Sequence, residues 1–402
     1  MLAPGVKSDR KTPSTGAIRL VTARECPKHP IPAKGMNTKV ITISLCMIVK
    51  DEEQTLARCL DSAKNVVDEI IIVDTGSKDK TKKIAKKYTP HVYTFDWIDD
   101  FSAARNFSFS KATMEYCMWL DADDILTPED QAAFLELKRT VSNTVDVIMM
   151  KYNTSFDAAG NPTFSYYRER LLRNHAGFVW AGAVHETIPP RGDILYSDIA
   201  VTHRKLGKGD PDRNLRIYES LIEKGVPLNP REQFYYAKEL YYHGRFGDAG
   251  QALEAYLDSG RGWVENEIDA CLHLSICHRS LGEKKQALSA LFRSFSYDVP
   301  RAEICCAIGR YFMEERAYAT AVFWYELATT RPRNDRSGAF VSPDCYGFIP
   351  YLQLCVCYDH LGDHVKAEHY NELAGEIKPD DPSVQSNRAY FASRKVSASN
   401  KE

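Results

Sequence analysis

Two short runs of almost uninterrupted apolar residues constrain the fold of this chain more than any other feature. They cover residues 40–49 (VITISLCMIV) and 69–74 (EIIIVD), and each leads directly into a polar turn. Such runs are typical of strands that are buried on both faces, as in parallel sheets covered by helices. We therefore expect the chain to begin its folded part with an α/β domain, over residues 39–212.

Strand and helix patterns alternate through this first part. After the first strand, Leu56, Cys59, Leu60 and Ala63 recur at helical spacing and predict a buried helix face. Alternation of this kind predicts βαβ units and a mostly parallel sheet. Further helices are expected at 79–88, 101–112 and 132–138, and further strands at 91–95, 116–120, 145–152, 166–174, 178–184 and 199–202.

From about residue 213 to 395 the sequence predicts helices only. Four segments share a local pattern, at 247–253, 282–288, 317–322 and 362–368. Their alanines, at positions 252, 287, 321 and 367, are 287 − 252 = 35, 321 − 287 = 34 and 367 − 321 = 46 positions apart. A period near 34 is typical of tetratricopeptide-like helical hairpins, and residues 331–343 are expected to hold an insertion. An irregular helical bundle is the alternative.

Composition limits the class of protein. The net charge of −2 gives no electrostatic reason to expect a nucleic-acid partner. Eleven cysteines without a secretory signal predict reduced thiols and a cytoplasmic protein, and no apolar run is long enough to span a membrane. Residues 1–38 lack hydrophobic periodicity and are expected to be a disordered extension or tag, with Met36 a candidate for the natural start. Residues 396–402 are expected to be a disordered tail.

An acidic cluster follows the strand expected at 116–120. Asp121, Asp123 and Asp124 would lie at the carboxyl edge of the sheet, where open α/β sheets bind ligands. Aspartates spaced in this way can bind one divalent cation while that cation holds a diphosphate. We expect Asp123 to bind the ion directly and Asp121 to face a ribose or the water shell of the ion. Asp124 is expected to be a turn residue, and solvated turn aspartates are the alternative for the whole cluster.

Other polar residues are expected near this edge. Asp74 and Ser77 follow the second strand and would either bind a nucleotide or act as turn and cap residues. Arg105, on a helix with Ser102 as its candidate cap, would either bind phosphate or form an ordinary surface ion pair.

Three residues nearer the end of the first part have side chains suited to proton transfer or metal binding. Glu186, after His185, is a candidate general base that deprotonates an incoming nucleophile. His203 follows a predicted strand and is a candidate third protein ligand of the ion, because imidazole suits Mn²⁺. A structural histidine is the alternative for His203.

These segments resemble a known family. SLCMIVKDEE (44–53), IVDTGSKDKT (72–81) and WLDAD (119–123) are similar to the opening and the Asp-x-Asp motif of family-2 glycosyltransferases with a GT-A fold. DFS (100–102), ARN (104–106), VHE (184–186) and VTH (201–203) resemble the subgroup with C-terminal tetratricopeptide repeats. That subgroup includes the sublancin-type peptide S-glycosyltransferases, which modify bacteriocin precursors.

The resemblance implies a metal-dependent, inverting transfer of a sugar from a UDP-sugar to a peptide or protein side chain, at Cys sulfur or Ser/Thr oxygen. It implies Mn²⁺ or Mg²⁺ at Asp121, Asp123 and His203, and catalytic roles for His185 and Glu186. Relatives often have Asn-Gly-Tyr where this chain continues after His203 with RKLG. The implied nucleotide contacts are Val49, Glu53, Asp74, Ser77, Arg105, Asp121 and Ala122.

Three other functions are possible for such a sequence. The first is a glycosyltransferase whose acceptor is a cell-envelope glycan. A nucleotidyltransferase usually needs a Gly-rich, basic loop after the first strand, where this chain has KDEE (50–53). A non-catalytic repeat adaptor is disfavoured by the intact acidic set. The helical repeats are expected to bind the acceptor or form a homodimer. A chain truncated after about residue 215 is expected to keep part of its donor hydrolysis but to lose transfer to a peptide.

Overall fold

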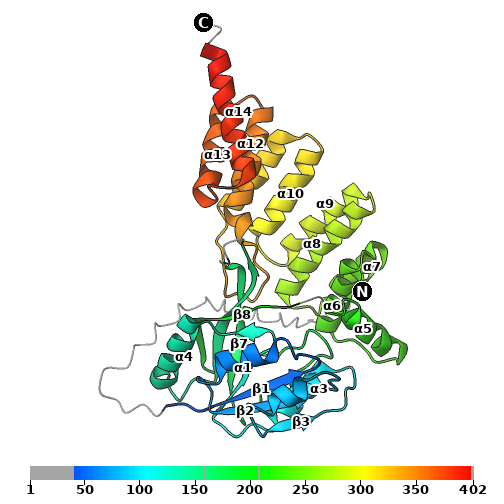
Figure 1. The fold of residues 1–402 in the computed structure, drawn as a ribbon. Coiled ribbons are helices and arrows are strands. Elements are labelled where there is room, and N and C mark those ends of the chain that lie inside the picture. Colours follow the sequence, from blue (N-terminus) through cyan, green and yellow to red (C-terminus); the bar gives the residue numbers. More distant parts are fainter. Residues whose placement is uncertain (1–39, 158–159, 161, 207–208, 400–402) are drawn as a thin grey trace, which may run out of the picture. The chain divides into compact units, whose positions relative to one another are not determined.

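The computed structural model describes residues 40–157, 160, 162–206 and 209–399 (Figure 1). The extension expected at 1–38 lies outside the described residues. The tail expected at 396–402 is described only to residue 399, where the last helix ends.

A single mixed sheet forms the centre of the first part of the chain. Its strand order is β3-β2-β1-β4-β7-β6-β8-β5. Strands β3, β2, β1 and β4 run parallel to one another, as do β6 and β8. Strand β7 pairs antiparallel with β4 and β6, and β5 pairs antiparallel with β8. The predicted mixed, mostly parallel α/β sheet is confirmed. The strands are β1 (Ile43–Val49), β2 (Glu69–Asp74), β3 (Val92–Thr94), β4 (Tyr116–Trp119), β5 (Asp124–Ile125), β6 (Val147–Phe156), β7 (Pro162–Arg173) and β8 (Ile194–His203).

Helices cover both faces of the parallel strands, which explains why those strands are apolar throughout. Leu45 of β1 packs in one cluster with α1 and α4, whereas Cys46 packs in another cluster with Phe107 and Phe109 of α3. The residues predicted to form the buried face of the first helix are all buried. The helices are α1 (Leu56–Ala63), α2 (Thr81–Ala85), α3 (Phe101–Phe109) and α4 (Pro128–Thr140).

The strand predicted at 178–184 is wrong. This segment contains one isolated bridge, between Ala181 and Thr187, and is otherwise irregular. Within the segment Gly182 has a φ of 100°, and the flanking residues Gly177 and His185 have φ angles of 76° and 51°, all outside the extended region that strands occupy. The apolar residues here are buried for other reasons: Ala183 and Val184 pack against helices that come later in the chain, and Trp180 packs on side chains of the sheet such as Trp119 and Leu172.

Helical hairpins make up the rest of the described chain, and the prediction of tetratricopeptide-like repeats is confirmed (Figure 1). Helix α5 (Arg213–Glu223) precedes the hairpins and α14 (Pro382–Ser399) follows them. The paired helices are α6 (Pro230–Tyr242) with α7 (Phe246–Asp258), α8 (Val264–Ser280) with α9 (Lys284–Arg293), α10 (Ala302–Glu314) with α11 (Tyr318–Thr329), and α12 (Phe348–His360) with α13 (His364–Ile377). Two 3₁₀ turns, η1 (Ser294–Ser296) and η2 (Pro343–Tyr346), lie between hairpins.

The repeat register differs from the prediction in the first hairpin. Two residues before each second helix, the chain adopts a positive φ, at Gly244 (71°), Gly282 (81°), Arg316 (57°) and Gly362 (83°). The fourth residue of each second helix is a buried alanine. In the first hairpin that alanine is Ala249 rather than Ala252, so the spacings are 287 − 249 = 38, 321 − 287 = 34 and 367 − 321 = 46. Ala252 is only partly buried, and it packs against the same core cluster from its edge.

The long third spacing is accounted for by the predicted insertion, which connects α11 to η2 over residues 330–342. The cysteines that the structure describes are all buried free thiols. Within the same described ranges, no helix has both the length and the hydropathy needed to cross a membrane.

Candidate active site

The carboxyl ends of three parallel strands bring predicted site residues to one edge of the sheet. Val49 of β1 is in register with Asp74 of β2, and Cys46 of β1 with Trp119 of β4, which leads into Asp121. Ala122 is buried in the core beneath this edge. The edge therefore gathers the predicted nucleotide residues from separate loops.

Asp74 is buried and only half satisfied. Its Oδ1 accepts the backbone N–H groups of Gly76 and Ser77, both at 3.0 Å, and lies 3.1 Å from Lys82 Nζ. Burial raises the pKa of Asp74, but hydrogen bonds from Ser77, Gly76 and Lys82 outweigh it and hold the pKa below its ordinary value. Its Oδ2 is buried and has no partner among the described residues. A buried acceptor of this kind can take a hydrogen bond from a ligand or a water.

Glu53 and Ser77 hold two neighbouring loops together. Asp51 N–H donates to Ser77 Oγ over 3.0 Å, and Lys80 N–H donates to Glu53 Oε2 over 3.0 Å. Glu53 N–H in turn donates to Asp79 Oδ2 over 3.0 Å. In this structure the two predicted nucleotide residues thus fix the loops that follow β1 and β2.

Arg105 connects two residues that are remote from each other in sequence. Its Nε donates to Glu186 Oε1 over 2.6 Å and its Nη2 to Asp121 Oδ1 over 2.8 Å. The buried guanidinium lies over the rings of both Trp119 and Trp180, 4.8 and 5.1 Å from their centroids. Burial alone would lower the pKa of Arg105. The charges of Glu186 and Asp121 outweigh burial and hold the pKa above its usual range. Its Nη1 is buried without a described hydrogen-bond partner.

Helix α3 delivers Arg105 to this position. Asp100 caps the helix, with Oδ1 accepting from Ala103 N–H over 2.9 Å, so the predicted cap at Ser102 is wrong by two residues. Ser102 instead donates to Asp100 over 2.7 Å. One turn further, the Asn106 amide pairs with the backbone N–H and C=O of Trp180, each over 2.9 Å. These contacts fix both the helix and one aromatic wall of the Arg105 site.

A group of possible metal ligands lies beside this site. Asp123, Asp124 and His203 each offer a ligand atom, and these atoms lie within 4.8 Å of one another. His203 Nδ1 is 3.4 Å from Asp123 Oδ1 and 3.3 Å from Asp124 Oδ1. Burial, with Asp121 and Asp124 close by, raises the pKa of Asp123 despite the opposing effect of His203. Crowded carboxylates of this kind favour a cation between them.

Asp124 is a buried strand residue as well as a neighbour of the cluster. It pairs with His203 across β5 and β8, and Tyr152 Oη donates to its Oδ1 over 3.0 Å. Its Oδ2 accepts from Arg170 Nη1 at 3.3 Å and from Asp121 N–H at 3.1 Å. Because both oxygens already have protein partners, Asp124 orients His203 and the acidic loop.

Glu186 lies in a closed turn, residues 181–187, in which Ala181 and Thr187 exchange backbone hydrogen bonds of 2.9 and 3.0 Å. The ring of His185, the residue before it, faces the helical repeats: its Nε2 is 2.6 Å from Glu239 Oε1 on α6. Glu186 itself faces Arg105. The two predicted catalytic residues therefore point to different partners.

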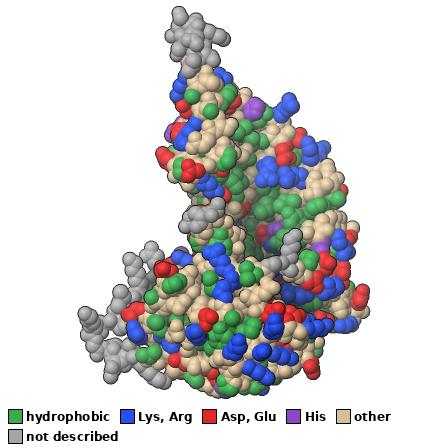
Figure 2. Space-filling model, viewed as in Figure 1, with side chains coloured by type: hydrophobic (Ala, Val, Ile, Leu, Met, Phe, Trp, Pro, Cys, Tyr) green, Lys and Arg blue, Asp and Glu red, His purple; other side chains and the backbone are tan. Residues whose placement is uncertain are grey.

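A cavity of about 690 Å³ extends from this turn along the inner side of the hairpins. We call it the aromatic groove, because Tyr166, Tyr167, Tyr235, Tyr242, Trp263 and Phe340 line it. Glu186 and His185 lie in its lining. Figure 2 shows the surface hollowed beside α8 and α10, with hydrophobic side chains in the hollow. The groove therefore leads directly to the candidate base.

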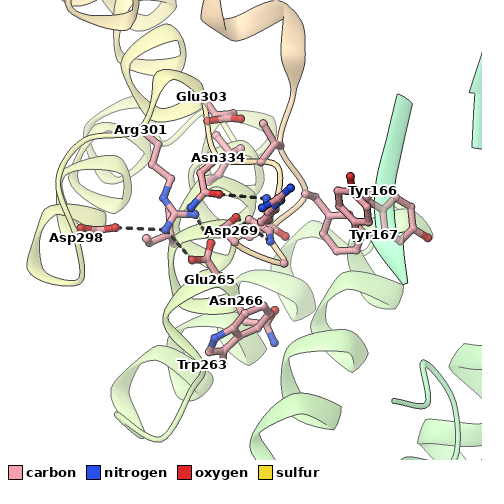
Figure 3. Close-up of a pocket in the computed structure, with 18 of the residues that line it drawn as sticks. Tyr166, Tyr167, Trp263, Glu265, Asn266, Asp269, Asp298, Arg301, Glu303 and Asn334 are labelled. Atoms are coloured by element: carbon pink, nitrogen blue, oxygen red, sulfur yellow. Dashed lines mark hydrogen bonds and ion pairs between the residues drawn. The ribbon is translucent and has the colours of Figure 1, made fainter. Parts of the chain in front are cut away.

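Charged side chains in the groove are mostly neutralised by neighbours. Lys238 Nζ is 2.8 Å from Asp269 Oδ2. Arg301 Nη2 is 3.0 Å from Glu265 Oε1 (Figure 3). The amides of Asn266 and Asn334 lie among these pairs and the aromatic rings. A surface of rings and amides with little net charge suits an uncharged or mixed-charge chain rather than a strongly charged ligand.

The structure thus brings Arg105, Asp121 and Glu186 into one hydrogen-bonded set, and Asp123 and His203 into a second. Sequence reasoning missed three contributors: Arg170, Asn106 and Glu239. Arg170 sits inside a predicted strand next in space to the acidic loop, and a charge in an otherwise apolar strand was a usable signal. The sequence around Glu239 held no such signal, because its partner His185 is 54 positions away.

Comparison with known proteins agrees with this site. Residues 44–186 match the family model described as "Glycosyl transferase family 2". A TPR repeat-containing protein of Synechococcus elongatus is 38% identical over 146 residues, which cover 36% of this chain and 35% of that protein. The SPbeta prophage-derived glycosyltransferase SunS of Bacillus subtilis is 27% identical over 215 residues, which cover 50% of this chain and 49% of that protein.

Among solved structures, a crystal structure of MamA matches 40% of this chain and 84% of its own, at 19% identity and a TM-score of 0.33. The chain spans about half, or less, of the length of the two curated relatives. The matched residues form a family-2 glycosyltransferase domain, and tetratricopeptide-like helical repeats follow it.

Proposed function

We propose that this protein is a metal-dependent, inverting glycosyltransferase that moves a sugar from a UDP-sugar to a side chain of a peptide or protein. The observation that carries the proposal is the single guanidinium of Arg105, which joins the Asp-x-Asp loop to Glu186. Arg105 thereby holds the loop of the proposed donor site and the candidate base in fixed positions relative to each other. The family-2 match and the likeness to SunS support the same reaction class.

The donor would bind at the carboxyl edge of β1, β2 and β4. The unpartnered Oδ2 of Asp74 offers an acceptor to a base or ribose, and the unpartnered Nη1 of Arg105 offers a donor to a phosphate. Arg105 holds Asp121 Oδ1, so we assign Asp121 to the nucleotide rather than to the ion. Asp121 remains part of the proposed donor site.

Asp123 and His203 would hold a divalent ion, Mn²⁺ or Mg²⁺. The donor set fits, because carboxylate and imidazole groups at close range suit such metals. Bound there, the ion would neutralise the diphosphate and stabilise the charge on the leaving group.

The transfer would be one displacement. The acceptor sulfur or oxygen forms a bond to the anomeric carbon while the bond from that carbon to the UDP oxygen breaks, and UDP leaves with the bonding electrons. The acceptor proton passes to Glu186, whose Oε1 is held by Arg105 and whose side chain lines the aromatic groove. Positioning and electrostatics supply most of the rate enhancement.

The acceptor would occupy the aromatic groove. An extended peptide presents alternating side chains and backbone amides, which match the aromatic rings and the amides of Asn266 and Asn334. A cell-envelope glycan is the alternative occupant, because rings also stack on sugars. A homodimer through the outer faces of the repeats is compatible with this use of the groove.

The test is to incubate the purified protein with Mn²⁺, several UDP-sugars and a peptide library containing Cys, Ser and Thr. UDP release and a peptide mass increased by one sugar are expected. A protein that neither binds UDP with Mn²⁺ nor releases it from any donor would instead be the non-catalytic repeat adaptor.

A further inference from the structure

The 181–187 turn is anchored mainly by the helical repeats rather than by the sheet that precedes it. Ala183 and Val184 are buried in a cluster with Leu215, Tyr218 and Phe234, which belong to α5 and α6. Tyr218 Oη donates to Val184 O over 3.4 Å. From the α/β part, Phe101 N–H donates to Ala183 O over 2.8 Å.

His185 is held in a backbone conformation that is uncommon for a residue other than glycine. Its φ of 51° lies in the left-handed region, which costs a non-glycine residue free energy and persists only where the surroundings enforce it. Its ring stacks on Tyr235, with centroids 4.3 Å apart and planes 16° apart. Arg231 Nε and Nη2 donate to its carbonyl, both at 3.3 Å. The ring and the backbone of His185 are thus both fixed from α6.

One face of α6 makes all these contacts. Arg231, Tyr235 and Glu239 are four residues apart in turn, so they lie one above the other on the helix. The side chain of Glu239 is only 7% exposed. Asn214 of α5 donates to the Glu239 oxygen that meets His185, over 3.1 Å. Glu239 is therefore a fixed acceptor whose position is set before any ligand binds.

We propose that Glu239 is a positioning residue for sugar transfer, because it fixes the ring of His185 and so holds the adjacent Glu186 against Arg105. This inference rests on the proposed function. It means that the first hairpin of the repeats completes the active site, in addition to any role in binding the acceptor.

The same helix also lines the aromatic groove, through Lys238 and Tyr242. Helix α6 would therefore position two things at once: the acceptor that lies along it and the turn that carries Glu186. The reacting atom of the acceptor and the base would keep their spacing even if the other hairpins shift.

The test compares Glu239→Ala and Glu239→Gln with the control Glu219→Gln. Glu219 lies on α5, is 38% exposed in its side chain and pairs with Arg245, so the control removes a carboxylate outside the site. We expect Glu239→Ala to lower kcat roughly 100-fold, the effect of a small displacement of a reacting group, with the KM for the UDP-sugar unchanged. Glu239→Gln keeps an oxygen acceptor and should lose less; it also serves if the alanine variant does not fold.

Two further measurements separate positioning from a general effect on folding. Hydrogen exchange at residues 182–187 should become faster in Glu239→Ala and stay unchanged in the control. In a double-mutant cycle, Glu239→Ala should have little further effect on kcat once His185→Ala is present, because both act through one contact. Additive effects, or unchanged kcat with unchanged exchange, would overturn the inference and leave the proposed function standing.

If the wild-type protein releases no UDP from any donor, the proposed function fails instead. Faster exchange of the turn in Glu239→Ala would then still support Glu239 as the residue that holds Glu186, and unchanged exchange would overturn that as well.

Discussion

Arg105 Nε donates to Glu186 Oε1 over 2.6 Å, across 81 positions of the sequence. Because Nη2 of the same guanidinium meets Asp121, movement of the donor loop is transmitted to the candidate base through one planar group. A planar fork with several fixed donors can do this, whereas an ammonium cannot.

Replacing Arg105 with Lys keeps the charge and removes the fork. We expect kcat to fall about 100-fold, since Glu186 and Asp121 can no longer both be held. Steady-state kinetics with saturating UDP-sugar would measure this. Arg139→Lys, on an arginine that is 64% exposed in its side chain, is the matched control and should behave as wild type. Equal activity of the two variants would contradict a linking role for Arg105.

Replacing Asp123 with Ala should remove a metal ligand. Activity should fall by a factor of roughly 100 to 1,000, as when one group that stabilises developing charge is lost, and UDP should bind more weakly with Mn²⁺. Calorimetric titration of UDP with and without Mn²⁺ checks the second effect. The control is Asp61→Asn, an exposed carboxylate paired with Lys64. Undiminished Mn²⁺-dependent binding in Asp123→Ala would remove Asp123 from the metal site.

Replacing Phe340 with Ala should weaken acceptor binding only. Phe340 lies on the insertion, 5.8 Å from the ring of Tyr166, and lines the aromatic groove. We expect the KM for a peptide acceptor to rise about tenfold, from the loss of one aromatic contact, while hydrolysis of the UDP-sugar stays constant. Phe323→Ala, an exposed aromatic on α11 outside the groove lining, is the control. A peptide KM that is the same in Phe340→Ala as in the control would place the acceptor elsewhere.

Asp269 in the groove gives a pH-dependent prediction. Burial raises its pKa, but His273 and Lys238 outweigh burial and hold the pKa below the ordinary 3.8. A carboxyl whose pKa is lower in the folded state stabilises the fold above the ordinary value, and this contribution is lost as the pH falls through the folded value. Asp269→Asn should therefore destabilise the protein by about 2 kcal/mol at neutral pH, since Lys238 loses its partner.

The difference between Asp269→Asn and wild type should shrink below about pH 4, where the wild-type carboxyl begins to lose its contribution. Urea unfolding of both proteins at neutral and acidic pH measures it. Because Asp269 is partly open to the groove, screening keeps the effect well below that of a fully buried pair. A constant difference across this pH range would show that the ion pair is not the cause.

Most of the fold could be predicted from local sequence patterns. The buried strands β1 and β2 and the face of α1 were predictable because each depends on residues within one segment. The strand expected at 178–184 failed for the opposite reason. Its apolar residues Ala183 and Val184 serve a helical core that is formed later in the chain, and periodicity does not distinguish the two kinds of burial.

The site was predictable residue by residue but not as a set. Asp121, Asp123 and Glu186 each follow an apolar segment, whereas their connection through Arg105 depends on how α3 packs. The sequence also led us to expect donor hydrolysis from a chain truncated after about residue 215. The contacts of His185 with α6 now lead us to expect the opposite, because truncation would remove the residues that hold the turn.

The insertion at 330–342 has a consequence for how the protein unfolds. Hairpin arrays normally lose their terminal units first, because each unit contacts only its neighbours. Here Phe340 meets Tyr166, and Arg336 lies over the ring of Tyr196 at 5.0 Å, so the third hairpin is attached to the sheet as well as to the second. Fraying of α12 to α14 can proceed alone, but melting of the three hairpins before them is coupled to the sheet, and these parts should unfold as one cooperative unit.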